Sequence, residues 1–155
     1  MNKKGLVLIL ALFVVLLALI PATASASIDL GNDNDLYTDT DVGHVINGQG
    51  GLDTINGKGG DDTLNGGNQC DVLHGNLGGD SLHGDGCGQN LLFGDDGWDD
   101  LHAHNGQFDD YLNGGDGINS CEGDRLWNEY GVLTYHDDMS QGCDMKTWHD
   151  YYQGV

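Results

Sequence analysis

The chain has 155 residues, of which 25 are acidic and five basic, so its formal net charge is −20. The length suits one domain and not comfortably two. Such an acidic chain excludes unaided binding to nucleic acid or an anionic membrane, and 27 glycines with three phenylalanines exclude an ordinary hydrophobic core.

Residues 1–26 have the pattern of a secretory signal peptide. Lys3 and Lys4 precede an apolar run from Leu6 to Ile20, and Pro21 and small residues follow. A membrane anchor is the alternative, but the run is shorter than the roughly 20 residues that span a bilayer. We expect cleavage after Ala26 or Ala24 and a secreted, extracellular protein. The remaining chain has three basic and 25 acidic residues, a net charge of −22.

Residues 27–47 carry Ile28, Tyr37 and Ile46 nine residues apart. Asp35 stands two places before Tyr37, and His44 stands two places before Ile46. This spacing is a degenerate form of the repeat that follows, and it predicts an N-terminal cap, because terminal repeats must seal an otherwise exposed core.

Residues 48–83 consist of four consecutive nine-residue segments, GQGGLDTIN, GKGGDDTLN, GGNQCDVLH and GNLGGDSLH. In each, glycines fill much of the first half, an aspartate stands at the sixth place and Ile or Leu at the eighth. The aspartates are Asp53, Asp62, Asp71 and Asp80, and the apolar residues are Ile55, Leu64, Leu73 and Leu82. A short fixed period indicates a solenoid.

The apolar series continues through residues 84–123 with two interruptions. It runs through Leu92, Leu101, Leu112 and Cys121, and the sixth place holds Asn90, Asp99, Asp110 and Asn119. One extra residue falls near Gly84 and two fall between His102 and Asn105, where we expect bulged turns. The repeat region is therefore predicted to span residues 27–123.

Residues 124–155 differ in composition, with more aromatic residues and fewer glycines. Leu126 to Tyr135 is predicted to form a short strand pair turning at Gly131, and Met145 to Tyr152 a helical turn or two. We interpret this segment as a small aromatic C-terminal cap.

The nonapeptide alternates a turn and a three-residue strand whose middle side chain points inward. We therefore expect an all-β fold, a right-handed parallel β-roll with two repeats per coil and a thin core of Ile and Leu. Carboxylates and carbonyls that point into stacked turns form an all-oxygen environment, which suits several calcium ions and not magnesium, because magnesium keeps its waters. A cation would also offset the charge of −22, so folding and binding should be one event.

Residues 48–83 resemble the glycine- and aspartate-rich repeat of RTX-type (hemolysin-type) calcium-binding proteins, G-G-x-G-x-D-x-U-x, and residues 28–122 do so loosely. The resemblance implies a parallel β-roll with calcium in its turns. It implies metal ligands at the sixth place, with uncharged asparagines at two positions, and at the first-place glycines: Asp53, Asp62, Asp71, Asp80, Asn90, Asp99, Asp110, Asn119, Gly48, Gly57, Gly66 and Gly75. The chain departs from that family in its N-terminal signal, its cysteines and the lack of a large neighbouring segment.

Four cysteines follow the signal, and an even number in an exported chain favours two disulfides, with three possible connectivities. In a β-roll with two repeats per coil, residues about 18 apart lie on neighbouring coils. Cys70 and Cys87 are 17 apart, so we predict the pairs Cys70–Cys87 and Cys121–Cys143.

Three further groups have alternative interpretations. His83 and His102 are expected on one outer face and are either solvated or a transition-metal site. His136, Asp137, Asp138, His149 and Asp150 are either cap residues or a catalytic or metal cluster. Val72, Leu91, Phe93 and Tyr111 should form an outer stripe that the cap covers or that serves self-association.

The function expected from these observations is that of an extracellular calcium-binding module that folds on calcium binding, without catalytic activity, in a structural or interaction role. One alternative is a subunit of an extracellular filament or surface assembly. Another is a secreted hydrolase that uses the C-terminal His/Asp cluster, although no G-x-S-x-G or H-E-x-x-H motif is present.

Overall fold

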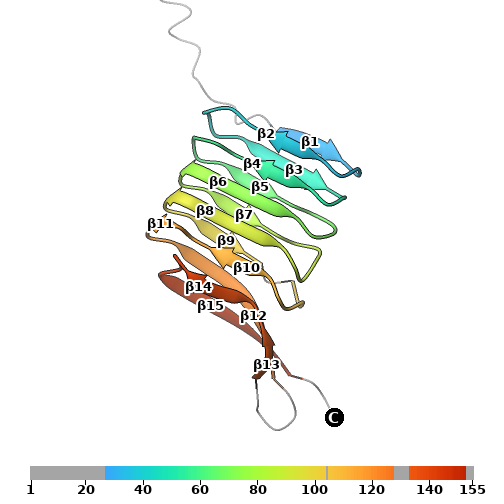
Figure 1. Ribbon diagram of the computed structural model, residues 1–155, viewed down its shortest axis with the longest axis vertical. Helices are drawn as coiled ribbons and strands as arrows, with labels where there is room; N and C mark the ends of the chain where they lie inside the picture. The colour runs from blue at the N-terminus through green and yellow to red at the C-terminus, as the bar shows by residue number, and fades with distance from the viewer. Residues whose placement is uncertain (1–26, 104, 128–132, 153–155) are drawn as a thin grey trace, which may run out of the picture.

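A computed structural model describes residues 27–103, 105–127 and 133–152. Every regular element in these residues is a β-strand, and all pair in parallel except β12 with β13. The coils stack into a ladder with β1 and β2 at one end and β14 and β15 at the other (Figure 1). The predicted all-β parallel β-roll is confirmed.

Two sheets form the two faces of the roll. Sheet A contains β1 (Ser27–Gly31), β3 (Val45–Gln49), β5 (Thr63–Asn65), β7 (Ser81–His83), β9 (Asp100–His102), β12 (Ser120–Trp127), β13 (Leu133–His136) and β15 (Met145–Tyr152). Sheet B contains β2 (Leu36–Thr38), β4 (Thr54–Asn56), β6 (Val72–Gly78), β8 (Leu91–Gly97), β10 (Tyr111–Asn113), β11 (Asp116–Gly117) and β14 (Asp138–Gln141).

The strand register gives two repeats per coil, as the sequence predicts. Ile55 of β4 stands beside Leu73 of β6, and Leu64 of β5 beside Leu82 of β7, each 18 residues on. The extra residue near Gly84 makes the next step 19, from Leu73 to Leu92. The turns absorb the insertions, so the inward positions stay aligned.

The turns that begin at Gly48 and Gly57 each contain two residues with positive φ. At the second place of the repeat, Gln49 and Lys58 both have φ of 71°, and at the fourth place Gly51 and Gly60 have φ of 120° and 97°. A side chain at the fourth place would also collide with the backbone of the previous coil, as a Cβ on Gly60 would with Gly43 N. Glycine at Gly51 and Gly60 is therefore favoured on two grounds, whereas the repeat 66–74 has Gln69 at this place with φ of 75°.

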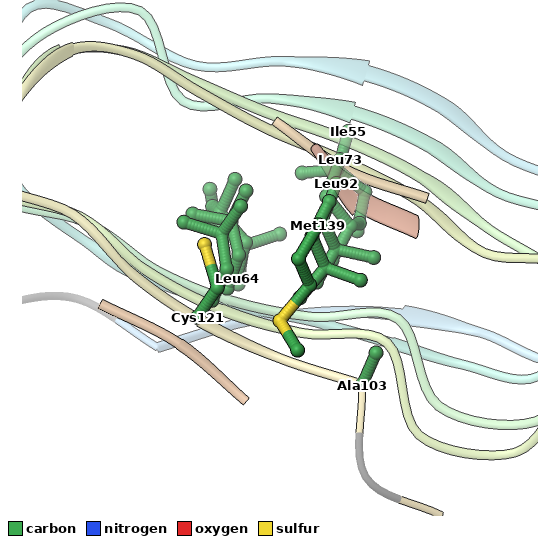
Figure 2. Close-up of a cluster of buried hydrophobic side chains, with 11 residues drawn as sticks. Ile55, Leu64, Leu73, Leu92, Ala103, Cys121 and Met139 are labelled. Carbon is green, nitrogen blue, oxygen red and sulfur yellow. The ribbon is translucent and has the colours of Figure 1, made fainter. Parts of the chain in front are cut away.

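The core is two residues wide, one inward side chain from each sheet. Its Ile and Leu side chains are fully buried: Ile46, Ile55, Leu64, Leu73, Leu82, Leu92, Leu101 and Leu112. Figure 2 shows Met139 in line with Ile55, Leu73 and Leu92, and Cys121 closing the stack that contains Leu64. Met139 is 2% exposed, so the repeat register resumes beyond residue 123, the predicted end of the repeat region.

The C-terminal segment extends the roll rather than folding over it. The predicted strand pair is present, because β12 pairs antiparallel with β13 and Leu126 stands opposite Tyr135; its turn lies outside the described residues. The predicted helical turn at Met145–Tyr152 is wrong, since these residues form β15, which pairs in parallel with all eight residues of β12. The open edge of β12 supplies backbone partners that outweigh the local helical preference.

The structure contains the two disulfides expected from the sequence. Cys70 and Cys87 join two turns on neighbouring coils with a Cα–Cα distance of 5.1 Å. Cys121, in the core, joins Cys143 just before β15 with a Cα–Cα distance of 5.7 Å. The second bond ties the last strand to the roll.

Residues 1–26, the predicted signal peptide, lie outside the described residues. Among the described residues, no helix is long and apolar enough to cross a membrane.

Candidate functional site

The sixth-place residues form two columns, one along each edge of the roll. The column that leads into sheet B, here the B column, contains Asp35, Asp53, Asp71, Asn90, Asp110 and Asp137. The column that leads into sheet A, the A column, contains His44, Asp62, Asp80, Asp99, Asn119 and Asp144. The predicted aspartate and asparagine ligands are all in these columns and are 0–2% exposed.

One side-chain oxygen of each buried column residue accepts a backbone hydrogen bond from the coil before. In the B column, Asp53 N–H donates to Asp71 Oδ1 at 2.8 Å, and Asp71 N–H donates to Asn90 Oδ1 at 2.8 Å. In the A column, Asp62 N–H donates to Asp80 Oδ1 at 2.7 Å. These bonds continue along both edges and fix the orientation of every side chain in the columns.

In most of the column aspartates, the second carboxylate oxygen, Oδ2, accepts no backbone hydrogen bond. Six Oδ2 atoms of the described column residues are buried without a hydrogen-bond partner: those of Asp35, Asp53, Asp62, Asp71, Asp80 and Asp99. A buried carboxylate with an unsatisfied oxygen is costly unless something positive compensates it. The repetition of the same unsatisfied atom coil after coil points to one cause rather than to isolated defects.

The first-place glycines define the space that these oxygens face. A Cβ on Gly57 would lie 2.6 Å from Asp62 Oδ2 and 3.0 Å from Gly75 O. A Cβ on Gly94 would lie 2.5 Å from Asp99 Oδ2 and 2.6 Å from Gly114 O. A carboxylate oxygen of one coil and a glycine carbonyl of the next therefore meet at a place where no side chain fits, and Gly48, Gly66 and Gly75 meet the Oδ2 atom of their own aspartate in the same way.

Burial shifts the titration of these carboxyls strongly. It raises the pKa of Asp71 to about 6 and that of Asp80 to about 7, in both cases with a contribution from neighbouring carboxylates. It raises the pKa of Asp110 to about 8, assisted by the charge of Asp137. Without a counterion, Asp80 and Asp110 would be partly or largely protonated at neutral pH, because desolvation disfavours the charged form.

The two asparagines satisfy their side chains in a different way. Asn90 Nδ2 donates to Cys87 O at 2.7 Å, and Asn119 Nδ2 donates to Gly142 O at 3.1 Å, while Oδ1 of each accepts a column bond. The amide group thus supplies a donor where an aspartate leaves Oδ2 unpaired. Asp110 is intermediate, since its Oδ2 accepts a long 3.5 Å bond from Asn105 Nδ2.

Each column contains a further acidic residue that the sequence pattern did not identify as a column member. Asp137 closes the B column, accepting from Asp110 N–H and Asp124 N–H, and Asp144 closes the A column, accepting from Asn119 N–H. The signal for the first was present, because Asp137 stands two residues before the inward Met139, the same spacing as in the repeats. The repeat pattern did not identify Asp137, because 27 residues separate it from Asp110.

The oxygens and carbonyls at these turns fit a hard cation. Each aspartate offers a fixed, buried oxygen, and each glycine lets a carbonyl approach it, which is the all-oxygen donor set that calcium takes. The donors at these places in the described coils are carboxylate and carbonyl oxygens, apart from the asparagine amides and His44.

The predicted histidine pair lies on the outer face of sheet A. His83 and His102 stand side by side with ring centroids 4.7 Å apart. His102 Nδ1 lies 2.7 Å from Glu122 Oε2, and His149 Nε2 lies 2.9 Å from Glu122 Oε1. The rings therefore belong to a surface chain of polar contacts that ends on β15.

The C-terminal His/Asp cluster is divided among several contacts. Both carboxylate oxygens of Asp137 accept backbone bonds, and Asp150 pairs with Arg125 at 3.0 Å. His149 contacts Glu122, whereas His136 Nδ1 lies 2.8 Å from Asp137 O. Of the residues that the sequence grouped, His136, Asp137 and Asp138 line one pocket, and Asp137 also accepts hydrogen bonds from two backbone N–H groups of the roll.

The outer stripe lies on sheet B. Phe93 stacks on His74 with centroids 4.6 Å apart and contacts Tyr111 at 5.7 Å, beside Val72 and Leu91. The alternative that the cap folds over this stripe is wrong, because β14 extends the edge of sheet B, and β13 and β15 pair with β12 in sheet A. Leu91 remains 39% exposed.

Comparison with protein-family models, with curated proteins and with solved structures finds no match to this chain.

Proposed function

We propose that this protein is an exported calcium-binding β-roll whose folding is coupled to calcium, with a structural or interaction role outside the cell. The observation that carries the proposal is the row of buried, unpartnered Oδ2 atoms that lie against the first-place glycines, at four turns beside a glycine carbonyl of the next coil. The resemblance of residues 48–83 to the RTX nonapeptide supports the same assignment.

Calcium bound at these turns would supply the positive charge that the buried carboxylates lack. The ligands are the five aspartates with an unpartnered Oδ2 in the repeats that begin with glycine, together with the glycine carbonyls beside them: Asp53, Asp62, Asp71, Asp80, Asp99, Gly66, Gly75, Gly94 and Gly114. We leave Asn90 and Asn119 out of this set because their amides already bond to carbonyls.

Coupled folding follows from charge and core size together. The core has one inward apolar side chain per repeat, and the chain after residue 26 has a net charge of −22. Carboxylates brought together along both edges repel one another in the folded state. A ligand that binds only the folded roll shifts the equilibrium toward it by mass action.

Export is supported by the pattern of residues 1–26 and by the two disulfides. Disulfides persist in oxidising compartments and are rare in the cytosol. The bonds Cys70–Cys87 and Cys121–Cys143 accordingly suit a protein that acts outside the cell.

A non-catalytic role is favoured over a hydrolase, because the C-terminal acidic residues are held in structural contacts. Asp137 accepts from Asp110 N–H and Asp124 N–H, and Asp150 pairs with Arg125.

Assembly through an outer surface is the second candidate, and the uncovered stripe Val72, Leu91, Phe93 and Tyr111 favours it. Sedimentation velocity in calcium at rising protein concentration tests it. Association that weakens in Leu91→Ser would support this candidate, and a concentration-independent monomer would remove it.

Isothermal titration of the calcium-free protein with calcium, and separately with magnesium, tests the main proposal. We expect several calcium ions per chain, bound with a simultaneous gain of far-UV circular dichroism, and a much weaker response to magnesium. Absence of calcium binding would overturn the proposal.

A further inference from the structure

The first coil departs from the repeat at two positions that contact each other. Asp39 occupies the first place, two residues after the inward Tyr37, where the following repeats have Gly48 and Gly57. His44 occupies the sixth place, where the following repeats have aspartate. In the later repeats, a side chain at the first place would collide with the aspartate at the sixth place. In the first coil both residues differ, so that Asp39 replaces the glycine and His44 replaces the aspartate.

These two replacements form a close pair. Asp39 Oδ2 lies 2.6 Å from His44 Nδ1, with the Asp39 side chain 2% exposed and the His44 side chain 18% exposed. Tyr37 Oη donates to the other oxygen, Asp39 Oδ1, at 3.3 Å. The carboxylate is thereby held from both sides, and the imidazole keeps one edge toward solvent.

Asp62 completes the group from the next coil. His44 N–H donates to Asp62 Oδ1 at 2.7 Å, and Asp62 Oδ2 is buried without a partner. That oxygen faces Gly57, which lies one coil on from Asp39, and Asp39 N–H donates to Asn56 O at 2.8 Å beside it. One ligand atom from each of Asp39, His44 and Asp62 lies within 4.8 Å of the others.

We propose that Asp39, His44 and Asp62 bind one transition-metal ion of the zinc type, at the N-terminal end of the A column. An imidazole nitrogen with two carboxylates suits zinc, cobalt or nickel, whereas calcium takes oxygen ligands. The metal takes the place of the proton that Asp39 and His44 share. It also gives Asp62 Oδ2 a partner, which this oxygen lacks when Asp39 and His44 contact only each other. Tyr37 orients the Asp39 ligand from behind.

The site differs from the proposed calcium turns in its donors. It shares Asp62 with them, so zinc and calcium compete for Asp62 Oδ2, and zinc binding displaces calcium at that one turn only. Zinc ligands lie about 2.0–2.2 Å from the ion, so two ligands of a tetrahedral ion stand about 3.3 Å apart. Asp39 Oδ2 and His44 Nδ1, now 2.6 Å apart, would therefore separate slightly to admit the ion, while the Asp62 carboxylate moves toward them. Three protein ligands leave one position of a tetrahedral ion to water. The inference does not require the calcium proposal, because the test can be read whether or not calcium folds the chain.

The experiment titrates the folded chain with Zn²⁺ and with Co²⁺ in saturating calcium, using calorimetry for the first and visible absorption for the second. We expect one tight site with a tetrahedral Co²⁺ spectrum. His44→Gln and Asp39→Asn should each weaken it at least tenfold. The double variant His83→Gln, His102→Gln, which removes the other histidine pair, should leave the site unchanged.

No binding by the wild type, equal binding by His44→Gln, or loss in the His83/His102 double variant would each overturn the proposal. X-ray absorption of the zinc-loaded wild type provides a readout that needs no variant, should His44→Gln fail to fold. Imidazole scattering together with oxygen ligands supports the site, and an all-oxygen shell contradicts it. If the calcium proposal is wrong, calcium will have no effect on folding while zinc binding persists.

Discussion

At the residue scale, the unpartnered Oδ2 atom separates a binding role for the column aspartates from a purely structural one. Oδ1 of each aspartate holds the previous coil through a backbone N–H, a role that an asparagine fills equally, as Asn90 does. The second oxygen is what only aspartate provides, and it is the atom that the structure leaves unsatisfied.

Asp80→Asn should therefore reduce calcium binding without damaging the fold. The amide oxygen can still accept from Asp62 N–H, while the new N–H₂ can donate to a carbonyl as in Asn90. We expect the calcium concentration at half-folding to rise about tenfold, equivalent to about 1.4 kcal/mol. Circular dichroism during calcium titration measures this. The exposed Asp116→Asn is the control and should behave as the wild type, and an unchanged midpoint in Asp80→Asn would count against the role of Oδ2.

Gly57→Ala tests the space beside Asp62 directly. The added Cβ would lie 2.6 Å from Asp62 Oδ2 and 3.0 Å from Gly75 O, so it should displace the carboxylate and lower the free energy of unfolding in calcium by about 1–3 kcal/mol. Gly59→Ala is the matched control, because its nearest neighbour is at 3.6 Å and neither glycine has positive φ. Equal denaturant midpoints for the two variants would contradict a tight cradle at Gly57.

Acidification should stabilise the calcium-free protein. Burial raises the pKa of Asp80 to about 7 and of Asp110 to about 8, so the folded chain binds more protons than the unfolded chain above pH 4. The free energy of unfolding therefore falls as the pH rises from about 4 to 8, by at most about 1.4 kcal/mol per pH unit and group.

Circular dichroism in metal-free buffer from pH 8 to pH 5 measures the effect as a growing folded fraction. His83, whose pKa is lowered by burial, opposes the trend with a single group. A folded fraction that shrinks over this range would show that the aspartates are not buried as described. Saturating calcium should weaken the dependence, because it holds Asp80 and the other proposed ligands ionised.

At the element scale, the repeat itself was predictable and its closure was not. The nine-residue spacing determines which side chain points inward, so the core from Ile46 to Cys121 and both disulfide pairs could be predicted from the sequence. β15 could not, because the eight residues from Met145 to Tyr152 have no alternation that favours a strand. Its conformation depends on the open edge of β12, which local sequence does not reveal.

Met139→Ala tests whether β14 continues the core. Met139 is 2% exposed and follows Leu112 in the sheet B stack, so its truncation should cost about 2–5 kcal/mol in calcium. Met145→Ala, on β15 and 56% exposed, is the control and should change stability by less than about 0.5 kcal/mol. Chemical denaturation measures both, and similar losses for the two would place Met139 outside the core.

The candidate site was likewise predictable from the sequence only in part. The column aspartates were predictable because they share the period of the core residues. Asp137 was predicted only as part of the C-terminal His/Asp cluster and not as a column residue, and Asp39 was not singled out. Asp137 follows a break of 27 residues, and Asp39 stands where the pattern has glycine. The stacking of coils brings Asp137 to Asp110, and the turn between β2 and β3 brings Asp39 to His44.

At the scale of the whole molecule, the roll has a core two side chains wide and a charge of −22 after residue 26, and we propose that it needs a counterion to stay compact at neutral pH. The disulfides restrict the unfolded chain, but they do not neutralise the columns. Calcium bound along both edges would do so, and the fold would then exist only where calcium is abundant, as it is outside cells.

The most direct test is small-angle scattering of residues 27–155 with intact disulfides, in calcium and after its removal at pH 7.5. We predict a compact, elongated particle in calcium. Without calcium, the radius of gyration should expand toward the roughly 37 Å of an unfolded chain of this length, and readdition should reverse the change. A radius of gyration that stays the same with and without calcium would contradict the account.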